Sequence, residues 1–427
     1  MTEAFLHHIW QMQYFDKKDL RTTGDESIAV FQPGFYNTNA GPDFNQARIR
    51  IGSLDWSGHV EIHVRSSEWD EHEHRTDHAY DNVILHVVWE DNRPVTRADG
   101  TAMPTLVLQG RVNTGLLHSY QKLMGTAHVI ACEGSWARVP SIIKWSMIEK
   151  SLVRRLQRKA QEILAVAEKN HFDWDDVAFR FLARNFGFKV NAEPFFQLAS
   201  RIDYRQLLKI ADRLLALEAL LFGQAGFLQA VGSDDPYVRN LKQEYDHLAA
   251  RWQLTDQQVN PALWKFLRLR PANFPTLRLA QFCSFLNTNR NLFSSLIEWR
   301  DISLIERNFS VAPSEFWRHH YHFGKPANLP QATLGVASVH NIVINTITPL
   351  WVAYGLSLND ESYIERAVDL LRQVPPESNA IVRKWRALDS KPTSAADTQG
   401  LIELFNEFCQ HKNCLNCTVG ASLVKPA

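Results

Sequence analysis

The hydrophobic period of this chain changes once, near residue 141, and this change limits the folds open to it. Before that point, short runs alternate apolar and polar residues, which is the period of half-buried strands. Beyond it, apolar residues recur at helical spacing up to about residue 410. The sequence therefore predicts an α+β protein with a small mixed α/β domain over residues 1–130, followed by a larger, irregular all-α domain over residues 131–427.

The N-terminal pattern predicts a helix, three strands, a short helix and further strands. The run Val83–Glu90 is nearly continuous in apolar residues, as in a strand buried on both faces. A turn at Arg97–Gly100 predicts a hairpin that leads into the last strand. The expected elements are a helix at 3–14, strands at 27–31, 47–51 and 58–64, a short helix after Ser67, and strands at 83–90 and 105–108.

Two carboxylates and a histidine fall at one edge of this predicted sheet. Asp43 lies just before the second strand, and Glu61 and His63 share one face of the third because they are two residues apart. If these strands pair as a hairpin, Asp43 and Glu61 lie near each other. Oxygen ligands of this kind suit Mg²⁺ or Mn²⁺, which keeps several waters and needs only one or two protein carboxylates.

The same residues suggest a division of roles. Asp43 and Glu61 hold the ion, and His63 orients water or contacts phosphate near neutral pH. Gln11 or Gln13 on the first helix completes the site. The alternative is that these carboxylates are solvated side chains on an exposed strand face.

A second constellation of histidines follows. A His-x-His pair with nearby acids, as at His72 and His74, is typical of Zn²⁺ or Fe²⁺ sites, including those of cupin-type barrels. An enzyme of this kind acting on a small molecule requires His72, His74 and His86 to converge. The alternative places His72 and His74 on a solvated surface and makes His86 a hydrogen-bonded core residue.

Pro42-Asp43 followed by Glu61-x-His63 resembles the PD-(D/E)xK nuclease signature, with His63 where that superfamily has Lys. The predicted order of helix, three strands, helix and strand is also the order of its core. The resemblance implies that Asp43 and Glu61 bind the metal and that the reaction is phosphodiester hydrolysis. Because His63 departs from the signature, a degenerate, non-catalytic module that binds nucleic acid or protein is the alternative.

A second resemblance covers nearly the whole chain. Five segments together resemble an uncharacterised bacterial family known only as a domain of unknown function, and this resemblance implies no activity. The segments are Asn39–Phe44, Gly58–His63, Asn82–Val88, Arg270–Pro275 and Cys414–Cys417.

The formal net charge of zero hides an asymmetry, because residues 1–130 are acidic and rich in histidine whereas the remainder is basic. Lys150, Arg154 and Arg158 cluster on one predicted helix, and Arg270 lies at a proline turn. Such cations can follow the phosphate backbone of DNA or RNA. They are equally well explained as a solvated face or as partners of acidic neighbours.

Three of the five cysteines lie close together near the C-terminus: Cys409, Cys414 and Cys417. The Cys-x₂-Cys spacing lets two sulfurs converge on one ion, and thiolates suit an iron–sulfur cluster or Zn²⁺. Cys132 is the natural fourth ligand, and His411 is its competitor. The alternative is a group of ordinary reduced thiols, which is also the interpretation of Cys283 in an apolar helix.

The sequence shows neither a basic segment followed by an apolar run at its start nor eighteen uninterrupted apolar residues. We therefore expect a cytoplasmic protein without a membrane partner. The interpretation favoured overall is a metal-dependent nuclease or a degenerate relative of one.

Overall fold

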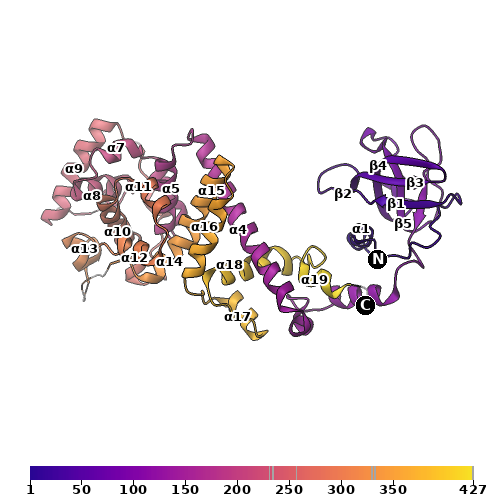
Figure 1. The fold of residues 1–427 in the computed structure, drawn as a ribbon. Coiled ribbons are helices and arrows are strands. Elements are labelled where there is room, and N and C mark those ends of the chain that lie inside the picture. The colour runs from indigo at the N-terminus through magenta and orange to yellow at the C-terminus, as the bar shows by residue number, and fades with distance from the viewer. Residues whose placement is uncertain (230, 233–234, 256, 328–329, 331–332, 426–427) are drawn as a thin grey trace. The chain divides into compact units, whose positions relative to one another are not determined.

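The computed structural model (Figure 1) confirms the α+β class, because 53% of residues are helical and 11% lie in strands, with a mixed sheet in the N-terminal part. The chain forms two compact units. The sheet unit comprises Met1–Met147 together with Leu404–Ala427, and the helical unit comprises Ile148–Glu403. The structure describes residues 1–229, 231–232, 235–255, 257–327, 330 and 333–425.

The two units divide inside a long helix, α4 (Ser141–Lys169), rather than near residue 130. The segment from Leu404 onward belongs to the sheet unit, although it follows the helical unit in sequence. Helical periodicity continues unbroken through α4, so the sequence pattern does not reveal where the packing partners of a helix change.

A six-stranded mixed sheet forms the centre of the sheet unit. Its strands lie in the order β1-β3-β4-β5-β6, and β2 pairs with the first two residues of β3, Phe44 and Asn45. The pairs β1–β3 and β3–β4 are antiparallel, whereas β4–β5 and β5–β6 are parallel. The strands are β1 (Ile28–Gln32), β2 (Phe35–Tyr36), β3 (Phe44–Ile51), β4 (Leu54–Arg65), β5 (Val83–Glu90) and β6 (Thr105–Val107).

The β3–β4 hairpin turns through Gly52, whose φ of 62° lies in the left-handed region that tight hairpin turns require. Along β4, Val60 and Ile62 alternate with Glu61 and His63, and all four side chains are buried. Helix α1 (Glu3–Met12) and helix α2 (Glu68–Glu71) both pack against β4. Because β4 is covered in this way, its polar side chains are buried as well.

The turn at residues 97–100 forms, but it does not pair the last two strands as a hairpin. It closes a single antiparallel bridge between Thr96 and Ala102, and Arg97 N–H donates to Thr101 O at 2.9 Å. The chain then returns to place β6 parallel to β5. The connection from Glu90 to Thr105 is long enough for the crossover that parallel strands need.

Helices and short turns form the rest of this unit. Thr2 caps α1, because its hydroxyl accepts from Phe5 N–H. The ring of Phe5 stacks on Tyr120 with centroids 4.0 Å apart, which joins α1 to α3. The remaining helices are α3 (Thr114–Met124), α19 (Thr418–Leu423), 3₁₀ turns at His78–Tyr80 and Glu133–Arg138, and a π-helical turn at Leu404–Cys409.

The helical unit is built from α4 onward around one apolar core. Helices α5 and α10 pack through Phe186 and Phe282, whose rings lie 4.8 Å apart. The helices are α5 (Trp174–Phe186), α6 (Ala192–Ser200), α7 (Tyr204–Leu208), α8 (Leu214–Gln224), α9 (Pro236–Trp252), α10 (Pro275–Thr288), α11 (Leu292–Glu298), α12 (Ile302–Phe309), α13 (Glu315–His319), α14 (Val336–Ile342), α15 (Thr348–Leu358), α16 (Ser362–Gln373), α17 (Ala380–Ala387) and α18 (Ala395–Glu403).

Short elements complete the helical unit. These are 3₁₀ turns at Pro261–Leu263 and Pro271–Asn273, a π-helical turn at Val343–Ile347, and a two-stranded ribbon of β7 (His320–His322) and β8 (Lys325–Pro326). Among the described helices, one stretch, Val336–Leu358, is long and apolar enough to cross a membrane. Since 67% of its most apolar window is buried inside the protein, it has the burial of a core helix.

A buried carboxyl group makes the stability of the helical unit depend on pH. Glu218 on α8 is 1% exposed, and burial raises its pKa to about 7. A raised pKa means that the folded protein holds a proton that the unfolded chain releases, so its stabilising contribution is full below about pH 4.5 and is lost as pH rises through about 7. We expect the free energy of unfolding to fall by up to about 3 kcal/mol across this window.

Urea unfolding of the wild type and the Glu218→Gln variant at about pH 5 and about pH 8 measures this effect. The wild type is expected to lose stability between the two conditions, and the variant to lose clearly less. An equal pH dependence in both proteins would show that other groups control it.

Candidate metal centre

The β3–β4 hairpin brings Asp43 and Glu61 together. Since Phe44 pairs with Val60, Asp43 lies beside Glu61 at the end of the hairpin. Glu61 Oε2 accepts from Asp43 N–H at 3.1 Å, and Asp43 Oδ2 accepts from Ile62 N–H at 3.0 Å. These reciprocal bonds fix the direction of both carboxylates. Their approach follows from the strand alternation and hairpin pairing that the sequence predicts.

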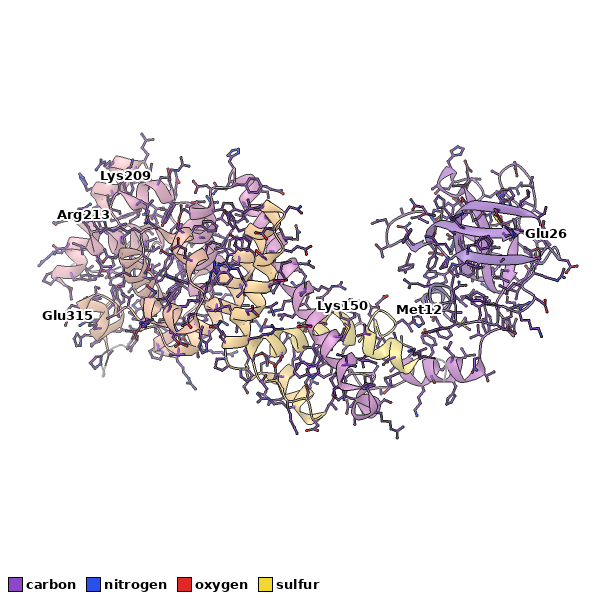
Figure 2. All side chains as sticks on the ribbon, viewed as in Figure 1. Met12, Glu26, Lys150, Lys209, Arg213 and Glu315 are labelled. Carbon is purple, nitrogen blue, oxygen red and sulfur yellow. The ribbon has the colours of Figure 1, made fainter. Side chains whose placement is uncertain are left out.

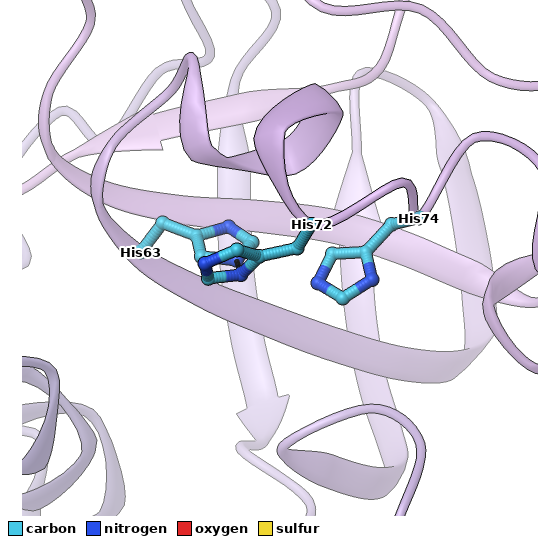
Figure 3. Close-up of side chains that lie close together, drawn as sticks. All are labelled: His63, His72 and His74. Carbon is cyan, nitrogen blue, oxygen red and sulfur yellow. Dashed lines mark hydrogen bonds between the residues drawn. The ribbon is translucent and has the colours of Figure 1, made fainter.

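Three histidines gather near Glu61, and Figure 3 shows their imidazole rings. His63 stands on β4, whereas His72 and His74 lie in the chain that follows α2. His63 Nε2 lies 3.2 Å from His72 Nδ1 and 3.7 Å from Glu61 Oε1. His74 Nε2 lies 3.2 Å from the same carboxylate oxygen. The three imidazoles therefore lie close to one another, and two of them, His63 and His74, lie beside the Glu61 carboxylate.

The spacing of these groups suits a single metal ion. One donor atom from each of His63, His72 and His74 lies within 4.8 Å of the others. With bonds of about 2.0 to 2.1 Å from metal to nitrogen, neighbouring ligands of one ion lie roughly 3 to 4 Å apart, so small rotations would bring these nitrogens onto it. His74 Nε2 is buried and lies 3.2 Å from Glu61 Oε1. The cluster can therefore bind a metal ion.

Two further histidines hold the first group in place. His86 Nε2 lies 2.9 Å from His63 Nδ1, and His86 is fully buried on β5. On α1, His7 Nε2 lies 3.2 Å from Asp43 Oδ2. Partners of this kind orient the ligands of a metal and fix the tautomer of a ligating histidine. With Nδ1 of His63 turned toward His86, Nε2 is left to face the cluster.

Burial sets the protonation of the cluster. It lowers the pKa of His63 to about 2, with further lowering from His86, and it lowers the pKa of His86 to about 3. A neutral His63 offers the lone pair that a metal requires. Burial also raises the pKa of Glu61, and the neighbouring Asp43 adds to the rise. A bound cation would offset this cost of ionising Glu61.

Removing the partner of His63 is expected to weaken metal binding. In a His86→Phe variant, His63 Nδ1 loses its neighbour and the ring its fixed orientation. We expect metal affinity to fall about 10- to 100-fold. Calorimetric titration with Zn²⁺ or Mn²⁺ measures this, with His118→Phe on the exposed face of α3 as the control. Equal affinities in both variants would remove His86 from the site.

The glutamines predicted to complete the site have other positions. Gln13 ends α1 in a left-handed conformation, and its Nε2 donates to Trp10 O at 2.7 Å. Gln11 is exposed on the same helix. The residue that α1 brings to Asp43 is His7, which the sequence reasoning missed. The available signal was its position one helical turn before Gln11.

The sequence allowed two interpretations of His72, His74 and His86: a metal site, or ordinary surface and core positions. The structure places the three histidines in different surroundings. His72 is exposed, as on a solvated surface, whereas His74 is only 9% exposed. The small-molecule interpretation required His86 to join them. The structure instead places His63 in the group with His72 and His74, and His86 lies behind His63.

The predicted nucleic-acid ligands differ in their surroundings. Lys150 (Figure 2) and Arg154 are exposed on α4, and Arg270 is exposed just before the 3₁₀ turn that follows it. Arg158 instead makes two hydrogen bonds to the buried carboxylate of Glu403, Nε to Oε1 at 3.1 Å and Nη2 to Oε2 at 2.8 Å. Its charge is therefore engaged within the helical unit.

Comparison with known proteins identifies a family for this chain but no activity. No curated protein and no solved structure matches this chain. A family model described as "Protein of unknown function (DUF2851)" matches residues 3–380. This match confirms the sequence resemblance to a family of unknown function, and the three C-terminal cysteines lie beyond its last matched residue. The chain belongs to the DUF2851 family.

Proposed function

We propose that this protein is a metal-dependent hydrolase of phosphodiester bonds in DNA or RNA. The observation that carries the proposal is the convergence of Glu61 with His63, His72 and His74 beside Asp43. A metal ion at this cluster would supply an activated water and neutralise charge on a phosphate oxygen. Asp43 lies close enough to hold or accept a proton from that water, and His7 keeps its carboxylate in place.

Two features support phosphodiesters as the substrate. Apart from the two-residue strand β2 and a 3₁₀ turn before β5, the order α1, β1, β3, β4, α2, β5 is the order that the nuclease resemblance implies. A pocket of about 260 Å³ includes His74 in its lining, and both basic residues (Arg75 and Arg97) and acidic residues (Asp81 and Asp99) line it. Arginine forks suit the oxygens of a phosphate group.

The donor set favours Mn²⁺, Zn²⁺ or Fe²⁺ over Mg²⁺. Imidazole nitrogens suit these transition metals, whereas Mg²⁺ prefers oxygen ligands throughout. In this proposal His63 is a metal ligand, in place of the role in orienting water that its position in the signature suggests. The reduced cysteines fit a reducing compartment, which supports a location in the cytoplasm.

A second candidate is a metalloenzyme that acts on a small molecule. The modest volume of the pocket beside His74 favours it, since Tyr80 stacks on that ring with centroids 3.8 Å apart and encloses the space. Such an enzyme would bind metal through the same histidines but cleave no nucleic acid. A module that only binds nucleic acid would instead show salt-dependent affinity that EDTA leaves unchanged.

The test is cleavage of labelled single- and double-stranded DNA and RNA by anaerobically purified protein with Mn²⁺ or Zn²⁺. We expect cleavage that EDTA abolishes and that the Glu61→Ala variant lacks. If the wild type cleaves none of these substrates with either metal, the proposal is wrong. If the metal binds but nothing is cleaved, the second candidate takes its place.

A further inference from the structure

Four of the five cysteines, from two distant parts of the sequence, are buried in the sheet unit. Cys132 precedes the 3₁₀ turn Glu133–Arg138, and Cys409 ends the π-helical turn that begins at Leu404. Cys414 and Cys417 lie in the loop that leads into α19. None of the four is more than 9% exposed.

The four thiols lie within electrostatic range of one another. Burial raises the pKa of Cys132 to about 12, and the thiols of Cys417 and Cys414 raise it further. Burial also raises the pKa of Cys409, and Cys132 is the next contributor. The four thiols therefore belong to one compact unit and are electrostatic neighbours there. His411, the competing ligand, is exposed.

The loop that carries Cys414 is anchored from several sides. Lys412 Nζ donates to Met124 O at 3.1 Å and to Thr126 O at 2.6 Å, which fixes the loop to the end of α3. Helix α19 approaches so closely that a Cβ on Gly420 would lie 2.2 Å from Cys414 O. The cysteines are thus held by packing, without a disulfide.

We infer that Cys132, Cys409, Cys414 and Cys417 bind a [4Fe–4S] cluster. Buried thiols that are electrostatic neighbours and form no disulfide gain stability when they ligate a metal as thiolates, because the metal offsets the mutual repulsion of the thiolates. The site is independent of the histidine cluster and of the function proposed for it.

The spacing of the sulfurs favours an iron–sulfur cluster over a single zinc ion. Among the described residues, the one group of three or more histidine, cysteine or acidic donors that lies within 4.8 Å is His63, His72 and His74. No three of the four sulfurs therefore lie within 4.8 Å of one another. Around one tetrahedral Zn²⁺, with bonds of about 2.3 Å, they would lie only about 3.8 Å apart. In a cubane each cysteine binds a different iron, which requires the wider spacing.

The expected role of the cluster is to join the C-terminal segment to the sheet unit. It would connect the chain just after α3 with the chain after Leu404, a pairing that spans the whole helical unit in sequence. A cluster in this position closes a very long loop. Its loss should therefore release the C-terminal segment without disturbing the central strands.

The test is chemical analysis of the full-length protein purified without oxygen. We expect about four iron and four acid-labile sulfide per chain, with a visible absorption band that dithionite bleaches. Iron held by the histidine cluster would bring no sulfide, so the two sites are distinguishable. Zinc at about one atom per chain without sulfide, or no metal at all after anaerobic reconstitution, would overturn the inference.

Variants locate the cluster. Cys132→Ser and Cys414→Ser are each expected to lose sulfide about tenfold, whereas Cys283→Ser, in the core of the helical unit, should keep it. Gly420→Val should also lose sulfide, since it displaces the Cys414 backbone while leaving every thiol in place. Should the cysteine variants fail to fold, Mössbauer spectra of the wild type decide the matter, and full sulfide in a folded Cys414→Ser protein contradicts the assignment.

Discussion

Replacing Glu61 by Gln is expected to abolish metal-dependent cleavage while the protein stays folded. One oxygen of Glu61 lies 3.2 Å from His74 Nε2 and 3.7 Å from His63 Nε2, where a metal would be bound. The other oxygen accepts from Asp43 N–H, a bond that a glutamine carbonyl can keep. Loss of the charged ligand should lower kcat/KM by about 10³-fold or more, with the Tm nearly unchanged.

Glu26→Gln is the matched control for this measurement. Glu26 is an exposed carboxylate in the same unit, before β1 (Figure 2), and its replacement should leave both kcat/KM and metal affinity unchanged. Cleavage by Glu61→Gln at the wild-type rate would remove Glu61 from the reaction. Equal losses in both variants would point to a general effect of charge.

The second large effect is expected in the helical unit. Glu403 is fully buried, and Arg158 meets it with two hydrogen bonds, while Arg155 Nη1 lies 3.4 Å from Glu403 Oε2. The Arg158→Ala variant leaves a buried carboxylate with one weaker partner. We expect the free energy of unfolding to fall by about 3 kcal/mol, as measured by urea titration.

The control and the rescue sharpen this test. Lys150→Ala, one exposed cation on the same helix, should change stability by less than about 0.5 kcal/mol. Replacing Arg155, Arg158 and Glu403 together by Met should recover most of the loss, because none of the three charges then remains to be buried without a partner. If Arg158→Ala is as stable as Lys150→Ala but binds nucleic acid more weakly, the assignment of Arg158 to Glu403 is wrong.

Much of the fold follows from local pattern, and it departs from the sequence prediction where a tertiary contact decides. The apolar run at Val83–Glu90 predicts β5, because a strand that is buried on both faces is apolar at nearly every position. The helical spacing of apolar residues continues through 203–222, yet α7 and α8 are separate helices there. Asn287 Nδ2 donates to Ala211 O at 2.7 Å, which satisfies a carbonyl in the break, and that partner on α10 is not visible in the local sequence.

In the candidate site, too, some contacts follow from the local sequence pattern and others depend on the tertiary fold. Asp43 and Glu61 meet because neighbouring strands pair, so the spacing along a hairpin predicts their approach. His74 joins them only because the chain after α2 folds back over β4, and His7 only because α1 covers that strand. Neither contact has a sequence period, and their recognition needs the three-dimensional fold.

The most direct test of the metal centre is anomalous diffraction from wild-type crystals grown with Mn²⁺ or Zn²⁺. We expect an anomalous peak that marks one metal ion, with nitrogens of His63, His72 and His74 and an oxygen of Glu61 at about 2.0 to 2.3 Å from it. A cluster without a peak at saturating metal, with His63 still beside His72 and His86 as it is here, would contradict it.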